Sequence, residues 1–116
     1  MEQIGGIYLD DLLHEMGDRI IARRKQLRLT QEELAEAAGV TPQMISTAEL
    51  GKKALRPSNI VKICTALGVS PDYLLLGKIS DTDHSILTQK MSCLSPEQYC
   101  HLEDIIDSFI AVATEK

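Results

Sequence analysis

Residues 30–49, with the sequence TQEELAEAAGVTPQMISTAE, decide the fold because they predict two short helices joined by one tight turn. Thr30, followed three residues later by Glu33, forms the pattern of a capping box at the start of the first helix. Gly39 suits the end of that helix, where a positive φ costs least in a residue without a Cβ atom. The Thr-Pro pair at 41–42 then supplies an N-cap and a first-turn proline for the second helix.

The apolar residues of this stretch predict how the two helices pack. Leu34, Ala35 and Ala38 recur at helical spacing in the first helix, and Ile45 and Ala48 do so in the second. Small residues allow the two helix axes to approach closely, and the glycine turn between them forces a steep crossing. The sequence therefore predicts a helix-turn-helix.

The flanking segments favour further helices with short connections, and hence an all-α fold. We expect helices at 18–27, 31–38, 42–49, 58–67 and 72–76. Residues 1–16 are expected to form a loose tail and a short amphipathic helix, which Gly17 separates from the helix at 18–27. One continuous helix through Gly17 is the alternative. Residues 17–77 would then form a five-helix domain.

The C-terminal part reads as a linker followed by one long helix. Residues 78–94 are mostly polar and can hold a short helix at 86–93. Ser95, Pro96 and Gln98 form a strong helix start, and the helix is expected to run to Thr114. Its apolar residues form one broad stripe, namely Tyr99, Leu102, Ile105, Ile106, Phe109, Ile110 and Ala113. We interpret residues 95–116 as a dimerisation helix, with packing onto its own domain as the alternative.

Charge is distributed unevenly along the 116 residues, whose net charge is −5. Between Arg19 and Lys62 there are nine basic and four acidic residues, so this segment carries +5. A basic segment in an acidic chain is typical of a surface that meets phosphate, although an ordinary solvated helix surface gives the same count. The chain has no apolar run long enough for a membrane span and no basic segment of a signal peptide, and three cysteines suit a reducing cytoplasm.

The only residues of metal-ligand type that lie near one another in sequence are His84, Cys93, Cys100 and His101. Their spacing matches no standard zinc arrangement, so we expect no metal and no cofactor. No Ser/His/Asp set, paired-carboxylate signature or Gly-rich phosphate loop occurs, so we do not expect an enzyme.

Residues 17–77 resemble the Cro and phage-repressor family of helix-turn-helix regulators, also called the xenobiotic-response-element type. The matching segments are R-x-x-L-x-L-T-Q-E-E-L-A at 24–35, G-V-T at 39–41, E-L-G-K at 49–52 and A-L-G-V-S-P-D-Y-L-L at 66–75. The resemblance implies a five-helix, lambda-repressor-like DNA-binding domain. It also implies a transcriptional regulator that binds a palindromic operator as a dimer.

The resemblance makes 42–49 the recognition helix, whose first residues enter the major groove of DNA. The implied base contacts come from Gln43 and Thr47, with Ser46, Met44 and Pro42 beside them. The implied phosphate contacts come from Gln31, Thr41, Lys52, Lys53 and Arg56. Arg24 and Glu49 are expected to form a structural ion pair.

Features of the helix 42–49 depart from the family pattern. The helix 42–49 has no Arg or Lys, which removes the usual guanine-reading contact and lowers the expected affinity. Ala48 stands where relatives carry a larger aliphatic residue, so the space beneath the helix must be filled from elsewhere.

The leading hypothesis is a cytoplasmic, dimeric repressor whose partner is double-stranded DNA, without a membrane association. The alternative is an antitoxin or partner-binding regulator whose C-terminal helices grip another protein.

Overall fold

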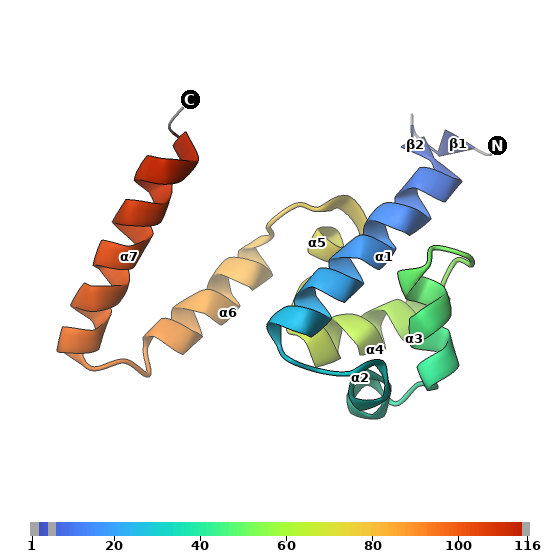
Figure 1. Ribbon diagram of the computed structural model, residues 1–116, viewed down its shortest axis with the longest axis horizontal. Coiled ribbons are helices and arrows are strands. Elements are labelled where there is room, and N and C mark those ends of the chain that lie inside the picture. The colour runs from blue at the N-terminus through green and yellow to red at the C-terminus, as the bar shows by residue number, and fades with distance from the viewer. Residues whose placement is uncertain (1–2, 5–6, 115–116) are drawn as a thin grey trace. The chain divides into compact units, whose positions relative to one another are not determined.

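The structure is a computed structural model that describes residues 3–4 and 7–114. These residues form seven helices and one short pair of antiparallel strands (Figure 1). The helices are α1 (Leu9–Gln26), α2 (Gln31–Ala38), α3 (Pro42–Glu49), α4 (Pro57–Leu67), α5 (Pro71–Leu76), α6 (Asp81–Met91) and α7 (Pro96–Thr114). The strands are β1 (Gln3–Ile4) and β2 (Ile7–Tyr8), which pair where a loose tail was expected. The all-α class is confirmed, with this strand pair as an addition.

The chain divides into two compact units, residues 1–83 and residues 84–116. The expected linker at 78–94 is largely helical, because α6 begins at Asp81 in the first unit and continues into the second. The short helix expected at 86–93 therefore begins five residues earlier than the apolar pattern indicated.

The first unit has one aliphatic core, to which each of the helices α1 to α5 contributes. The buried apolar residues are Leu13, Met16, Ile20, Leu34, Ala35, Ala38, Ile45, Ala48, Ile63, Cys64, Leu67 and Leu74. The spacing that predicted the crossing of α2 and α3 thus identified their buried face, since Leu34, Ile45 and Ala48 are fully enclosed.

Gly17 does not break α1, and the prediction of two separate helices is wrong. The residue is buried in the middle of one helix, where α3 passes across α1. A Cβ atom at this position would lie 2.5 Å from the Glu49 carbonyl oxygen and 2.7 Å from that of Ala48. Glycine is therefore needed for a close approach of two backbones. Ala48 lies at this crossing and is fully buried, so the small side chain expected to leave space beneath α3 is enclosed by its neighbours.

Two arginines of α1 hold the carboxyl ends of other helices. Arg19 Nη1 donates to the carbonyl oxygens of Leu74 and Leu75, at 3.0 and 3.2 Å. Arg23 Nε donates to the carbonyl oxygen of Leu67 at 2.9 Å. The last carbonyls of a helix lack partners within the helix, so these bonds fasten α5 and α4 to α1.

Asp83 joins the start of α6 to the start of α5. One of its carboxylate oxygens accepts from the backbone N–H of Ser70 at 2.9 Å, and the other accepts from the Ser70 hydroxyl at 2.6 Å. The N–H and hydroxyl of Ser80 also donate to this carboxylate, at 2.9 and 3.0 Å. Burial raises the pKa of Asp83, but the four hydrogen bonds outweigh it and hold the pKa at about 2.

The second unit contains no buried residue among residues 84–114. Its long helix begins as predicted, because Gln98 N–H donates to the Ser95 hydroxyl at 3.2 Å and Ser95 N–H donates to the Gln98 side chain at 2.9 Å. Large apolar side chains of α7 are open to solvent, with Ile105 64% exposed and Phe109 72% exposed.

Candidate nucleic-acid interface

The turn between α2 and α3 is built by the local signals that predicted it. Thr30 and Glu33 form the full capping box, with both hydrogen bonds at 3.0 Å. Gly39 ends α2 with φ at 72°, in the left-handed region. The hydroxyl of Thr41 accepts from the Met44 N–H at 3.1 Å and so caps α3. These bonds fix the direction in which α3 leaves the turn.

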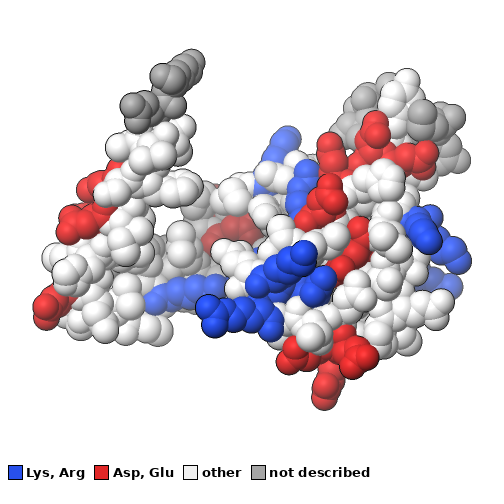
Figure 2. Space-filling model, viewed as in Figure 1, with Lys and Arg blue, Asp and Glu red and all other residues white. Residues whose placement is uncertain are grey.

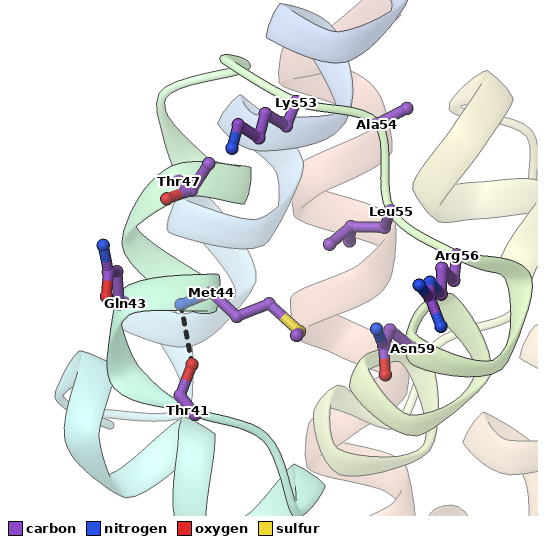
Figure 3. A pocket seen from close by; sticks show the side chains of 9 residues that line it. All are labelled: Thr41, Gln43, Met44, Thr47, Lys53, Ala54, Leu55, Arg56 and Asn59. Carbon is purple, nitrogen blue, oxygen red and sulfur yellow. Dashed lines mark hydrogen bonds between the residues drawn. The ribbon is translucent and has the colours of Figure 1, made fainter.

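The outward face of α3 presents polar and uncharged side chains. Ile45 and Ala48 are buried beneath the helix. On the outside, Thr41, Pro42 and Gln43 are exposed, and Met44, Ser46 and Thr47 are partly exposed. Gln43 and Thr47 lie one turn apart on the same side of α3 in Figure 3. The five side chains expected to contact bases thus remain accessible to solvent. Among those that can form hydrogen bonds, Gln43 is more exposed than Ser46 and Thr47.

The carboxyl end of α3 is held by a buried cluster around Glu49. Arg24 contacts both oxygens of the Glu49 carboxylate, Nε at 2.6 Å and Nη2 at 3.1 Å. Arg24 Nη1 also donates to the carbonyl oxygen of Leu29 at 2.9 Å. Glu49 is only 6% exposed, so its carboxylate has lost most of its contact with water. The bidentate contact with Arg24 compensates for this loss. The structure places the two expected partners in direct contact.

Gln31 is the third member of this cluster, which sequence reasoning missed. Its Nε2 donates to the Glu49 carboxylate at 2.9 Å. The amide nitrogen is therefore engaged inside the domain, and an anion at this end of α2 would meet backbone N–H groups rather than the Gln31 side-chain amide. Nothing in the local pattern indicated this, because the two residues are 18 positions apart.

A hollow of about 340 Å³ separates α3 from the loop that leads to α4 (Figure 3). The side chains of Met44 and Leu55 extend into it in this view. Lys53 and Arg56 are exposed at its edge, and Asn59 lines it from α4. Lys53 and Arg56 thus share one concave surface with Gln43 and Thr47. Leu55 and Asn59 were not predicted as site residues, since the path of a loop depends on tertiary packing.

The basic segment is less basic at its surface than its sequence count indicated. Of its nine cations, Arg19, Arg23 and Arg24 bond carbonyls or Glu49 inside the domain. The other six are exposed, namely Lys25, Arg28, Lys52, Lys53, Arg56 and Lys62. In Figure 2, acidic side chains gather over α2 at the lower edge, whereas basic ones lie at the right edge over the loop that follows α3. Positive charge therefore flanks α3 on its loop side.

The residues of metal-ligand type and the cysteines are candidates for a second site within the described part of the chain. No group of three His, Cys, Asp or Glu side chains is arranged there to hold a metal ion. Burial raises the pKa of the Cys64 thiol to about 11, and the negative charge of Asp83 adds to the rise, so this cysteine is an unreactive core residue. None of the helices described is long and apolar enough to cross a membrane.

Comparisons with known proteins match this part of the chain. A family model described as helix-turn-helix matches residues 20–74. Repressor protein C2 of Salmonella phage P22 is 41% identical over 68 residues, which are 59% of this chain and 32% of that protein. The regulator DicA of Escherichia coli (strain K12) is 32% identical over 88 residues, which are 76% of this chain and 64% of DicA. The chain thus spans about a third of the length of C2 and just under two thirds of DicA.

The fold of the first unit also matches a solved complex with DNA. The crystal structure of the P22 c2 repressor with a synthetic operator superposes with a TM-score of 0.53 and 41% identity. The match covers 54% of this chain and 96% of that chain. The match covers only about half of this chain because the chain has a lambda-repressor-like domain followed by additional C-terminal helices.

Proposed function

Because this chain belongs to the helix-turn-helix family of Cro and phage-repressor type, we propose that it is a transcriptional regulator that binds operator DNA through α3. The observation that carries the proposal is the position of α3. Its carboxyl end is fixed to α1 through Arg24, Glu49 and Gly17, and its amino-terminal half is open to solvent. A helix held in this way is presented to a major groove as a rigid element. Its role is recognition rather than catalysis.

Gln43 and Thr47 are the proposed base-reading residues. The Gln43 amide is exposed and can donate and accept together, which suits the major-groove edge of adenine. Thr47 can hydrogen-bond a base or contact a thymine methyl group. Ser46, Met44 and Pro42 lie beside them and shape the fit.

The flanking loop supplies the proposed phosphate contacts. Lys52, Lys53 and Arg56 are exposed next to α3, and Thr41 lies at its amino end. At the start of α2 the contribution of Gln31 comes through its backbone. Since α3 itself carries no Lys or Arg, these flanking contacts provide most of the electrostatic affinity.

The proposal is tested by selecting bound sequences from a random DNA library and measuring the affinity of variants for the selected site by fluorescence anisotropy. Gln43→Ala is expected to weaken binding to that site by about 5- to 150-fold and to leave binding to unrelated DNA nearly unchanged. Lys53→Ala is expected to weaken both and to lower the slope of log affinity against log salt by about one unit. Gln89→Ala and Lys90→Ala make the same chemical changes on α6 and serve as matched controls.

Two outcomes would contradict these roles. Equal loss of affinity for all sequences in Gln43→Ala would remove this residue from base reading. An unchanged salt slope in Lys53→Ala would remove the loop from the phosphate contacts. If the selection yields no preferred sequence at all, the function itself is wrong.

We further propose that the chain acts in the cytoplasm as a homodimeric repressor on a palindromic operator, with α7 as the dimerisation helix. The support is an apolar stripe on α7, none of whose residues is buried. The stripe consists of Tyr99, Leu102, Ile105, Ile106, Phe109, Ile110 and Ala113. An exposed stripe of this width is unfavourable in water and marks an interaction surface. A twofold dimer would set two copies of α3 one turn of DNA apart, about 34 Å.

Phe109→Asp tests this interface, because it introduces a charge at the most exposed large side chain of the stripe. It is expected to raise the dimer dissociation constant by at least about 10- to 100-fold, the value of burying one phenyl ring. Ala111→Asp adds the same charge on the opposite side of α7 and is the matched control. Size-exclusion chromatography with light scattering measures both. Equal dimerisation of the two variants would exclude the stripe from the interface.

A second candidate function is a regulator whose C-terminal helices bind a different protein, as an antitoxin does. One observation favours it, because α7 carries Glu97, Glu103, Asp104 and Asp107 and no Lys or Arg. Four like charges on each copy oppose self-association and suit a basic partner. A chain that stays monomeric at micromolar concentration would favour this candidate over the homodimer.

A further inference from the structure

We propose that two copies of the chain interlock in antiparallel orientation, so that α7 of each copy lies in the notch between α6 and α7 of the other. The proposal rests on the dimeric function above and specifies how the second copy is held. It also assigns a role to α6 and to the loop 92–95, which the stripe on α7 alone does not involve.

The first observation is the notch itself. From the loop 92–95 onward, α6 and α7 diverge instead of packing along each other (Figure 1). Between them lie two hollows, of about 390 and 350 Å³, which share Met91 and Tyr99 in their linings. Leu94 lines the first hollow, and Leu102 and Ile106 line the second. Two helices that leave apolar hollows between them and bury no residue do not form a complete core.

The second observation is that α7 extends well beyond these hollows. With 19 residues it is about 28 Å long, whereas α6 has 11 residues and is about 16 Å long. The lining of the hollows ends at Asp107. Phe109, Ile110 and Val112 follow in the extending part, at 72%, 52% and 72% exposure. Each copy therefore carries both a recess with mostly apolar lining, bordered by Glu103 and Asp107, and an apolar projection.

The orientation follows from matching recess to projection. In an antiparallel pair centred near Ile106, the projecting end of each α7 lies opposite the recess of the other, which leaves both filled. In a parallel pair the two recesses face each other and stay empty, which forfeits packing. Antiparallel helices also place opposite ends of their dipoles together. Of the acidic side chains of α7, Glu97 and Asp104 lie away from the stripe at about 3.6 residues per turn, whereas Glu103 and Asp107 line the second hollow and border the contact.

Disulfide cross-linking of the full chain distinguishes the orientations. In a background with Cys93→Ser and Cys100→Ser, the remaining cysteine is the buried Cys64. Tyr99→Cys and Ala113→Cys are then added in separate proteins, since these positions are about 21 Å apart along α7. Under mild oxidation neither protein alone is expected to cross-link, whereas a mixture allowed to exchange subunits is expected to give the cross-linked heterodimer. Ile106→Cys alone is expected to cross-link to itself, and Asp104→Cys, on the opposite side of α7, is the negative control.

The outcomes separate this inference from the function on which it rests. Self-cross-linking of both Tyr99→Cys and Ala113→Cys would show a parallel dimer and overturn the interlock alone. If Tyr99→Cys weakens the dimer, as light scattering under reducing conditions reports, Leu102→Cys mixed with Ile110→Cys repeats the measurement nearer the centre. A wild-type chain that is monomeric, or is found only with a different protein, would overturn both the interlock and the homodimer.

Discussion

Gly17→Ala is expected to destabilise the first unit, although alanine is the better helix former. The new Cβ atom would lie 2.5 Å from the carbonyl oxygen of Glu49, which is backbone and cannot rotate away. Overpacking of this kind costs about 2–3 kcal/mol, and the helix propensity of alanine offsets about 1 kcal/mol. The net loss of about 1–2 kcal/mol corresponds to a fall in Tm of about 4–16 °C for a unit of this size.

Thermal and urea unfolding followed by circular dichroism measure this effect. Ala22→Gly, at an exposed position of the same helix, calibrates the propensity contribution and is expected to cost about 0.5–1 kcal/mol. If only propensity mattered, Gly17→Ala would be more stable than the wild type by a similar amount. A variant of equal or greater stability would therefore refute the close approach of α1 and α3.

Two other contacts give predictions of their own. Glu49→Gln leaves the charge of Arg24 largely buried without its partner, and it is expected to lower the free energy of unfolding by about 3 kcal/mol at neutral pH. A loss below about 1 kcal/mol in urea unfolding would contradict the role of the pair. Because the pKa of Asp83 is lowered, to about 2, its ionised form adds stability above its ordinary pKa, near 3.8, and this stability is lost as pH falls toward 2. The stability difference between the wild type and Asp83→Asn, about 1 kcal/mol after allowance for solvent screening, should thus be constant above pH 5 and shrink below pH 4.

The features that were predicted correctly depend on neighbouring residues. The bounds of α2 and α3 agree with the expectation because Thr30, Gly39 and Thr41 act within three or four positions of themselves. The start of α7 follows from Ser95 in the same way. Local hydrogen bonds of this kind do not depend on the rest of the fold, so one sequence suffices to find them.

The features that were missed depend on residues far away in the sequence. Gly17 resembles a helix breaker until α3 is known to cross it, and the hydrogen bond from Gln31 to Glu49 joins two residues 18 positions apart. The early start of α6 is different, because Ser80 and Asp83 form a reciprocal capping pair three positions apart, a local signal that sequence reasoning overlooked. Periodicity reports which face of a helix is apolar, but it does not report which backbone or side chain lies against it.

The arginines of α1 have a genetic consequence. Arg19, Arg23 and Arg24 each hold a different helix, so a substitution at any of them lowers the amount of folded chain rather than altering its contact with DNA. In a cell that also carries a normal copy, such alleles should be recessive. If the chain pairs as proposed, alleles at Gln43 leave folding and pairing intact, form mixed dimers with the normal chain and should be dominant. Dominance would thereby separate residues that build the domain from residues proposed to read the operator, even where the two kinds lie close together in the sequence.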